Sequence, residues 1–222
     1  MKNLVIIGSG AVAAELTSFI GDKSFSAESG IRIKGYIDYH ENIEIYWKRY
    51  NLKNPVMGDI DTYKIAEDDW FVIGISDVKF RRKMYEKMKS RGGKFINIIH
   101  PTAIVAGDVV MGEGNIINPY CIIGPNVKIG DFNLLTSQSV ISHDSILGTN
   151  NILSTALLCG HVRVGDDNAF GIRSTVIPHL TIGSSNTIQA GMIVDRNVDD
   201  NSVVFHRFKE KVLLINHSSD SE

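Results

Sequence analysis

The sequence predicts an α/β domain over residues 1–100, a parallel β-helix over residues 101–205 and a C-terminal tail over residues 206–222. Two observations lead to this prediction. Before Pro101, strand-like apolar runs alternate with helix-like segments, which is typical of a parallel sheet with crossover helices. After Pro101, apolar residues recur at every sixth position. A period of six fits neither a helix nor the irregular turn spacing of hairpins.

Length and composition restrict the class of protein. The chain has 222 residues, 43% of them hydrophobic, enough for one large or two small domains. A formal net charge of -2 offers no basic surface for nucleic acid. Cys121 and Cys159 lie inside apolar repeats and predict no disulfide framework. The apolar run in MKNLVIIGSG is too short for a secretion signal or a membrane span. We therefore expect a cytoplasmic protein without membrane contact.

The α/β domain is expected to hold four strands and two helices. Asp77 is the expected N-cap of the second helix, which continues through Ser90 and ends at Gly92 and Gly93. The other expected elements are strands at Asn3–Ile7, Ile33–Ile37, Phe71–Ile75 and Phe95–Ile98 and a helix at Val12–Ile20.

The six-residue period forms two apolar columns. They are out of phase by one residue, so one residue is missing between Leu153 and Val164. Three short strands per coil of a triangular prism would bury each column residue, with small residues at the corners, where left-handed backbone angles are needed. The columns are Val105, Met111, Ile117, Ile123, Ile129, Leu135, Ile141, Leu147 and Leu153, then Val164, Phe170, Val176, Ile182, Ile188 and Val194.

A glycine-rich loop follows the first strand. Gly8, Gly10 and Ala13 form a GxGxxA pattern, in which backbone N–H groups and the helix dipole can hold a phosphate. Asp38 ends the second strand, where an acidic side chain can reach a ribose hydroxyl. These residues keep an NAD-dependent enzyme open as an alternative. Because three or four strands are about half of a full dinucleotide fold, a mononucleotide fits better.

The repeats resemble those of the hexapeptide-repeat acyltransferases. The matching segments are IVAGDV, VMGEGN, IIGPNV, KIGDFN, VISHDSILG and VRVGDDNAFGIRSTVIPHLTIG. With IIGSG, GYID, PVMGDID, VIGISD and IHPTAIV, nearly the whole chain resembles the sialic acid O-acetyltransferases and nucleotide-amino-sugar N-acetyltransferases of the bacillosamine-pathway type. The resemblance implies a left-handed β-helix, a homotrimer and acetyl-CoA bound between neighbouring β-helices.

The resemblance also implies that His143 is a general base. Acyl transfer from a thioester needs a base for the attacking amine or hydroxyl, and donors for the developing oxyanion. His143 follows Ile141 of the column by two residues, at a corner that should face solvent, and Asp144 could orient its ring. The structural alternative is a solvated turn histidine. Backbone N–H groups near Gly160 are candidate oxyanion donors.

The late coils carry the positions that the resemblance assigns to acetyl-CoA. His161 stands where the family more often has asparagine. It either contacts the acyl carbonyl or lies where the missing residue disturbs the coil, and it follows the column by two residues if Cys159 extends it. Arg207, Lys209 and Lys211, in place of the family's usual Gly-x-Pro-Ala-Lys ending, either meet CoA phosphates or form a solvated tail. The acetyl-CoA residues expected beside His161 are Gly160, Gly171, Ile172, Ala190 and Gly191.

In the family, the Rossmann-like N-terminal domain binds the nucleotide of a nucleotide-sugar. Val12 replaces a histidine that family members commonly use to contact the substrate, so the nucleotide or sugar can differ here. The residues at the corresponding places are Gly8, Ser9, Gly10, Asp38, Gly74 and Ser76.

The resemblance therefore predicts an enzyme that moves acetyl from acetyl-CoA to the amine of a nucleotide-linked amino-sugar, with a 4-amino-sugar expected, for surface glycan synthesis. O-acetylation of a sialic acid or similar sugar hydroxyl is the near alternative. A non-catalytic sugar-nucleotide-binding protein is the alternative of another class. We expect no metal site from the sequence.

Overall fold

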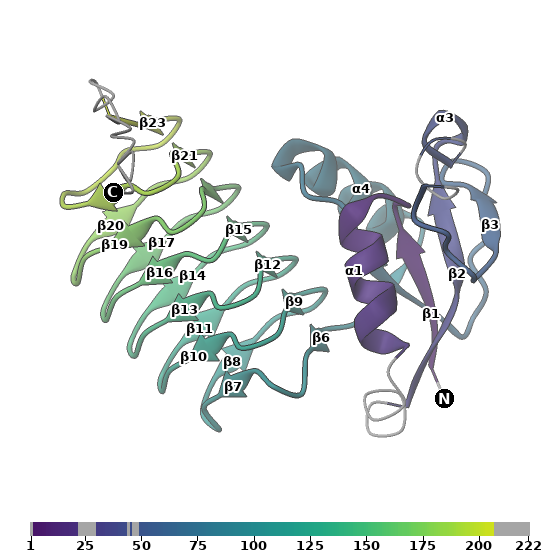
Figure 1. Ribbon diagram of the computed structural model, residues 1–222, viewed down its shortest axis with the longest axis horizontal. Helices are drawn as coiled ribbons and strands as arrows, with labels where there is room; N and C mark the ends of the chain where they lie inside the picture. The colour runs from purple at the N-terminus through teal and green to yellow at the C-terminus, as the bar shows by residue number, and fades with distance from the viewer. Residues whose placement is uncertain (1, 22–29, 44, 46–48, 207–222) are drawn as a thin grey trace, which may run out of the picture.

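The fold is described from a computed structural model, in which an α/β domain lies beside a long coil of short strands (Figure 1). None of the helices in the described part of the chain is long and apolar enough to cross a membrane. The expected basic residues Arg207, Lys209 and Lys211 lie outside the described residues. The residues described are 2–21, 30–43, 45 and 49–206.

The α/β domain contains a parallel sheet with strand order β3-β2-β1-β4-β5. This is the order of the first five strands of a dinucleotide-binding fold. The expectation of four strands was wrong, because β3 was missed. The expected strand Phe95–Ile98 was also wrong, since its two ends pair in different sheets. The elements are β1 (Lys2–Ile7), α1 (Ala11–Ile20), β2 (Ile31–Asp38), α3 (His40–Asn42), β3 (Val56–Asp59), β4 (Asp69–Ile73), α4 (Val78–Ser90) and β5 (Lys94–Phe95).

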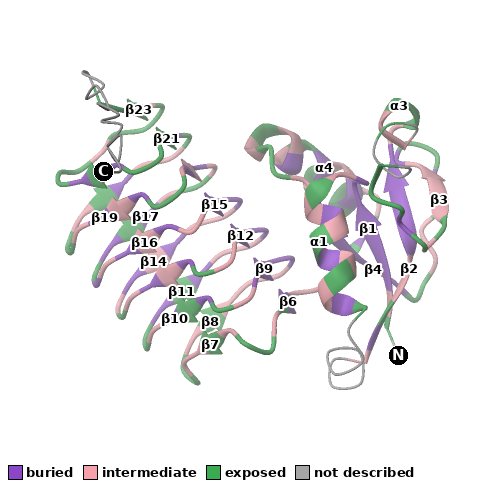
Figure 2. Ribbon diagram, in the orientation of Figure 1, coloured by how far each residue is buried: buried purple, intermediate pink, exposed green. Residues whose placement is uncertain are grey.

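Helices α1 and α4 cover opposite faces of this sheet. Alternate residues of β1 point to opposite faces, and Leu4 packs in one buried cluster with Leu16 of α1, whereas Val5 packs in another with Met84 of α4. Asp77 caps α4 as expected, because its carboxylate accepts a hydrogen bond from the Phe80 N–H at 2.7 Å. The purple strands of Figure 2 show the resulting core.

The second half is a parallel β-helix with three faces. From β6 to β22, successive strands go to face 1, face 2 and face 3 in turn, and β23 then returns to face 1. Face 1 contains β6 (Ile98–Ile99), β9 (Ile116–Ile117), β12 (Leu134–Leu135), β15 (Ile152–Leu153), β18 (Ala169–Phe170), β21 (Thr187–Ile188) and β23 (Val203–Val204). Face 2 contains β7 (Ile104–Val105), β10 (Ile122–Ile123), β13 (Val140–Ile141), β16 (Leu157–Leu158), β19 (Thr175–Val176) and β22 (Ile193–Val194). Face 3 contains β8 (Val110–Met111), β11 (Lys128–Ile129), β14 (Ile146–Leu147), β17 (Arg163–Val164) and β20 (Thr181–Ile182).

Both predicted columns form the interior of the β-helix. The missing residue lies between Leu153 and Leu158, which are consecutive column residues only five positions apart. The condition that Cys159 extends the column is therefore not met, and His161 follows the column residue Leu158 by three positions. The shortened turn, at Ser154 and Thr155, lies between faces 1 and 2. It is not at His161, which lies at the turn between faces 2 and 3.

The residues with left-handed backbone angles at the corners are not confined to the small residues that the sequence predicts there. Left-handed backbone angles occur mostly at residues other than glycine, among them Tyr120, Phe132 and His161. The glycine after a column residue is required by packing instead. A Cβ on Gly124 would lie 2.8 Å from the backbone nitrogen of His143 in the next coil. These glycines therefore let the coils stack at close range.

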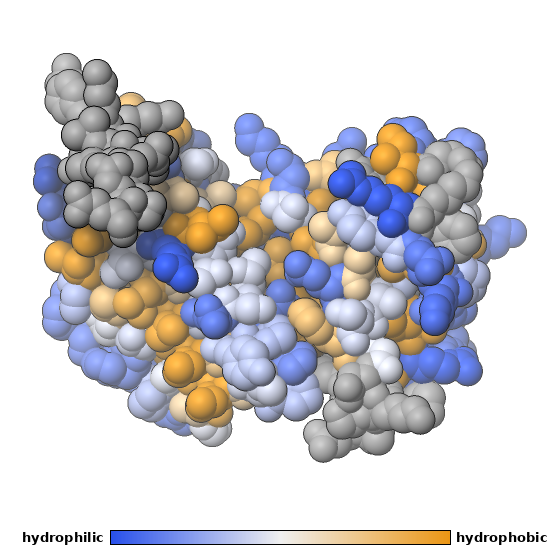
Figure 3. Space-filling view, in the orientation of Figure 1, coloured by the Kyte–Doolittle hydropathy of each residue, from blue (hydrophilic) through white to orange (hydrophobic). Residues whose placement is uncertain are grey.

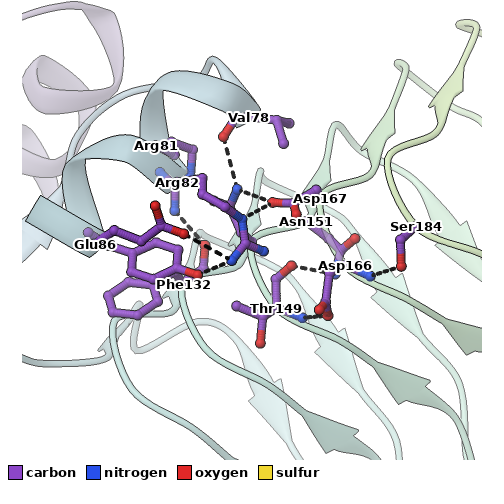
Figure 4. A network of polar contacts seen from close by, with 12 residues as sticks. Val78, Arg81, Arg82, Glu86, Phe132, Thr149, Asn151, Asp166, Asp167 and Ser184 are labelled. Atoms are coloured by element: carbon purple, nitrogen blue, oxygen red, sulfur yellow. Dashed lines mark hydrogen bonds and ion pairs between the residues drawn. The ribbon is translucent and has the colours of Figure 1, made fainter. Parts of the chain in front are cut away.

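The two halves share a buried junction. Outward-facing residues of face 1, such as Ile116 and Leu134, pack in one cluster with Leu16 of α1. Arg81 of α4 is fully buried and donates to the carbonyl of Phe132 at 2.7 Å, while Arg82 pairs with Asp167 at 2.6 Å (Figure 4). These contacts attach α4 to the corner between faces 3 and 1.

Candidate active site

His143 and Asp144 form a pair at the corner between faces 2 and 3. The Nδ1 atom of His143 lies 2.7 Å from Oδ2 of Asp144. The His143 side chain is 55% exposed, so it faces solvent as its position in the repeat predicts. A ring that donates from Nδ1 to a carboxylate presents Nε2 as an acceptor. The pair can therefore accept a proton from a bound molecule.

The Asp144 carboxylate is held by the preceding coil. Its Oδ1 accepts a hydrogen bond from the Asn126 side chain at 2.7 Å. This hydrogen bond, and then the one from His143, keep the pKa of the Asp144 carboxyl below its usual range. An ionised Asp144 orients the imidazole and stabilises its protonated form.

Gly160 supports the His143 ring from the next coil. A Cβ on Gly160 would lie 2.8 Å from Nε2 and 2.8 Å from Cε1 of His143. The N–H of Gly160 has no acceptor among the described residues. The ring and a free backbone donor thus lie side by side.

His161 lies above Asp144 in the stack of coils. Its Nε2 is 3.7 Å from Oδ2 of Asp144, and its side chain is 47% exposed. Its ring meets that of His143 edge-on at 5.3 Å and stacks on that of His179 at 4.6 Å. One donor atom each from His143, Asp144 and His161 lies within 4.8 Å of the others, which is compatible with a metal ion.

The other residues predicted for acetyl-CoA are not at this corner. They lie at the corner between faces 1 and 2, where Ile172 is exposed. Face 2 thus separates the two groups within one chain. The first group is His143, Asp144, Gly160 and His161, and the second is Gly171, Ile172, Ala190 and Gly191.

The residues predicted for the nucleotide-sugar line one cleft of about 360 Å³ at the carboxyl ends of β1, β2 and β4. Val12 also lines this cleft. Asn42, Tyr50 and Phe80 line it as well. No motif in the sequence predicted them, because they come from separate segments that only the fold brings together. The predicted residues in the lining are Gly8, Ser9, Gly10, Asp38, Gly74 and Ser76.

Asp38 fixes the glycine loop. Its Oδ2 accepts from the N–H of Ser9 at 2.8 Å and from the Ser9 hydroxyl at 2.7 Å, and its Oδ1 accepts from Asn42 at 3.0 Å. Asp38 is only 3% exposed. Asp38 therefore positions the loop through Ser9, and contact with a ribose stays a prediction.

The three glycines of the cleft differ in why a glycine stands at each position. Gly8 has a φ of 100°, and a Cβ there would lie 2.7 Å from Ile75. A Cβ on Gly74 would lie 3.0 Å from the Cβ of Ala13, so Gly74 lets α1 approach β4. Within the described part of the chain, no atom lies near the Cβ position of Gly10, and no side chain caps α1, which Gly10 precedes. The free N–H groups at the start of α1 can bind an anion.

A second cleft, of about 570 Å³, lies between α4 and the late coils of the β-helix. It shares Ser76 and Asp77 with the first cleft. Lys79 and Arg82 line one side of it, next to the polar network of Figure 4. The two clefts make a continuous recess along the junction.

Comparison with known proteins identifies similar enzymes, although no family model matches the chain. A UDP-N-acetylbacillosamine N-acetyltransferase from Bacillus subtilis is 27% identical over 114 residues, which are 51% of this chain and 50% of that protein. The chain thus matches about half the length of this curated relative.

Solved structures match over a greater length. PerB of Caulobacter crescentus, in complex with CoA and GDP-perosamine, matches with a TM-score of 0.78 and 26% identity over 91% of this chain and 93% of that one. The acetyltransferase domain of PglB from Neisseria gonorrhoeae matches with a TM-score of 0.77 and 19% identity over 91% and 96%, which supports the fold alone. The resemblance inferred from the sequence is confirmed: the chain is similar, over most of its length, to nucleotide-amino-sugar N-acetyltransferases.

Proposed function

We propose that this protein is a cytoplasmic, homotrimeric, left-handed β-helix enzyme. It transfers acetyl from acetyl-CoA to the amino group of a nucleotide-linked amino-sugar, for surface glycan synthesis. The hydrogen bond of 2.7 Å between His143 and Asp144 is the observation that carries this proposal. The similarity to a GDP-perosamine N-acetyltransferase with bound CoA supports it.

The chemistry follows from the geometry of the pair. The Nε2 of His143 accepts the proton that the sugar amine loses as its nitrogen attacks the thioester carbonyl. The Gly160 N–H is suited to stabilise the oxyanion of the tetrahedral intermediate. When the intermediate expels the CoA thiolate, protonated His143 can return the proton to sulfur.

The separation of the two predicted residue groups supports a homotrimer. Face 2 exposes apolar side chains, among them Ile104 at 65% and Ile193 at 66%, and Figure 3 shows apolar side chains along the β-helix half of the visible surface. Around a threefold axis facing face 2, the His143 corner of one copy would meet the Ile172 corner of the next. The acetyl-CoA site would then contain residues from both copies.

The cleft of the α/β domain suits the nucleotide. Its free N–H groups at the start of α1 would hold a phosphate, and the adjoining recess beside α4 leaves room for the rest of the molecule. Val12 at the cleft supplies no polar contact, so the sugar or nucleotide can differ from those of enzymes with a histidine there.

Thiol release from acetyl-CoA tests the proposal. The wild type and His143→Ala would be assayed with UDP-, dTDP- and GDP-linked 4-amino-sugars and with free sialic acid. We expect release with one nucleotide-linked amino-sugar and a loss of about a hundredfold or more in the mutant.

Other outcomes are informative. Release with sialic acid alone would favour O-acetylation. Equal release by His143→Ala would remove His143 as the base. No release with any acceptor, together with no binding of CoA, would favour a non-catalytic sugar-nucleotide-binding protein.

A further inference from the structure

The corner between faces 2 and 3 carries a stack of polar side chains, one from each coil. The stack runs from Asn126 through Asp144 and His161 to His179, and each of these four residues has left-handed backbone angles. Residues at this position repeat about every 18 residues, so their side chains lie above one another along the corner. The repeat therefore places His161 above the ionised carboxylate of Asp144, and His143 lies beside the same carboxylate as its neighbour in the sequence.

We propose that His143, Asp144 and His161 form a site for a divalent transition-metal ion, with Zn²⁺ as the best fit. Two imidazoles and one carboxylate are ligands that Zn²⁺ accepts, and three protein ligands leave a fourth position for solvent. The proposal revises the sequence expectation of no metal.

The donor spacing suits such an ion. Tetrahedral zinc with bonds of about 2.0–2.1 Å places neighbouring donors about 3.3 Å apart. Oδ2 of Asp144 lies 2.7 Å from His143 Nδ1 and 3.7 Å from His161 Nε2, and all three atoms lie within 4.8 Å. Small side-chain rotations would bring them to the required spacing.

The surroundings hold these ligands in place. Asn126 donates to the other oxygen of Asp144 at 2.7 Å. His179 stacks on the ring of His161 with an angle of 9° between the planes. Gly160 limits the movement of the His143 ring from the side of the next coil. Such outer contacts orient metal ligands in known sites.

Metal binding would switch off the proposed base, and this consequence rests on the proposed function. An ion on Nδ1 of neutral His143 requires the ring proton to be on Nε2, where the acceptor lone pair is needed. The ion would also take the Asp144 oxygen that orients the ring. Bound Zn²⁺ is therefore an inhibitor that competes with proton transfer and not a catalytic ion.

Calorimetric titration of Zn²⁺ into the untagged protein tests the site directly, without acetyl-CoA or an acceptor. We expect saturable binding in the wild type, and an affinity weaker by about tenfold or more in His161→Asn. His206→Asn, which changes an exposed histidine outside the cluster, is the matched control and should bind as the wild type does. Co²⁺ should give the visible absorption of a four-coordinate ion in the wild type and lose it in His161→Asn.

Equal Zn²⁺ affinity in His161→Asn and the wild type, or no saturable binding, would overturn the proposal. The inhibition is tested separately, by adding Zn²⁺ and then EDTA to the acetyl-transfer assay. If the wild type binds Zn²⁺ but transfers no acetyl group, the metal site stands and the proposed function fails.

Discussion

The imidazole of His143 lies against the α-carbon of Gly160, one coil further along the β-helix. Any side chain at Gly160 would place its Cβ 2.8 Å from Nε2 of His143. Glycine at this position is therefore a condition for the observed ring position, although its backbone angles are open to other residues.

We predict that Gly160→Ala lowers kcat by about tenfold to a hundredfold, because the ring must move away from its position beside Asp144. The fold should survive, since the ring can rotate toward solvent. Acetyl-transfer kinetics with a thermal melt would measure both effects.

Gly107→Ala provides a matched control. Gly107 holds the equivalent place three coils earlier, two residues after Val105, and a Cβ there has open space among the described residues. Its kcat should equal that of the wild type. If Gly160→Ala kept full activity, the contact between these two residues would have no role in catalysis.

Much of this corner could be predicted from the sequence, and the rest required the stacking of coils. His143 and Asp144 are neighbours in a recognisable motif. Asn126 and Gly160 lie 18 and 16 residues away from Asp144, so their contacts depend on which positions lie above one another. The six-residue period contained that signal, because three hexads make one coil.

The fold was predictable where the period was strong and not where an element was short. β3 (Val56–Asp59) was missed because it is a four-residue, half-buried edge strand without apolar alternation. The missing residue was placed only within Leu153–Val164, because apolar residues at 157, 158 and 159 can each continue a column. Pairing of Leu158 with Ile141 resolves the register.

Arg81 should be a major source of stability at the junction. Its guanidinium is fully buried, and burial lowers its pKa to about 9 because it disfavours the charged form, so the stabilisation comes from the hydrogen bonds of Arg81 and not from its charge. It donates to the carbonyls of Ile73, Ile75 and Phe132 at 2.9, 2.7 and 2.7 Å. Because Arg81→Met would leave three carbonyls without this donor, we expect the free energy of unfolding to fall by about 3–5 kcal/mol.

Urea denaturation would measure this loss, with Arg82→Met as the control. Arg82 is the next residue and pairs with Asp167 near the surface, so its replacement should cost only about 0–1 kcal/mol. Similar losses for the two variants would contradict the role assigned to the buried hydrogen bonds.

Buried asparagines form a ladder of hydrogen bonds at the corner between faces 3 and 1. We expect these asparagines to contribute unequally to the free energy of unfolding. The side-chain nitrogen of Asn133 donates to Asn115 and to the carbonyl of Gly148, and its oxygen accepts from Asn151. Asn133→Ala should lower the free energy of unfolding by about 2–4 kcal/mol, because it breaks the ladder on both sides.

Asn186 is the last asparagine of the ladder, so it tests whether the ladder hydrogen bonds on both sides of Asn133 are the source of its stabilisation. Its side-chain nitrogen has no hydrogen-bond partner among the residues that the structure describes, and its oxygen accepts from the N–H of Ser202 at 2.6 Å. Asn186→Ala should therefore cost about 1 kcal/mol. Urea titrations of the two variants compare them directly, and an equal loss would mean that the ladder bonds contribute little.

The two cysteines should differ in reactivity. Burial raises the pKa of the Cys121 thiol to about 11, and the side chain lies inside the β-helix. Cys159 is partly exposed at the His143 corner. Because the thiolate is the reactive form, Cys121 should react about a hundredfold more slowly than an ordinary thiol even before its burial limits access.

Labelling with a chromogenic disulfide at pH 8 should therefore give one fast thiol, and the second only after unfolding. Cys159→Ser should lose the fast phase, whereas a fast phase that persisted in this variant would show that the β-helix opens at Cys121.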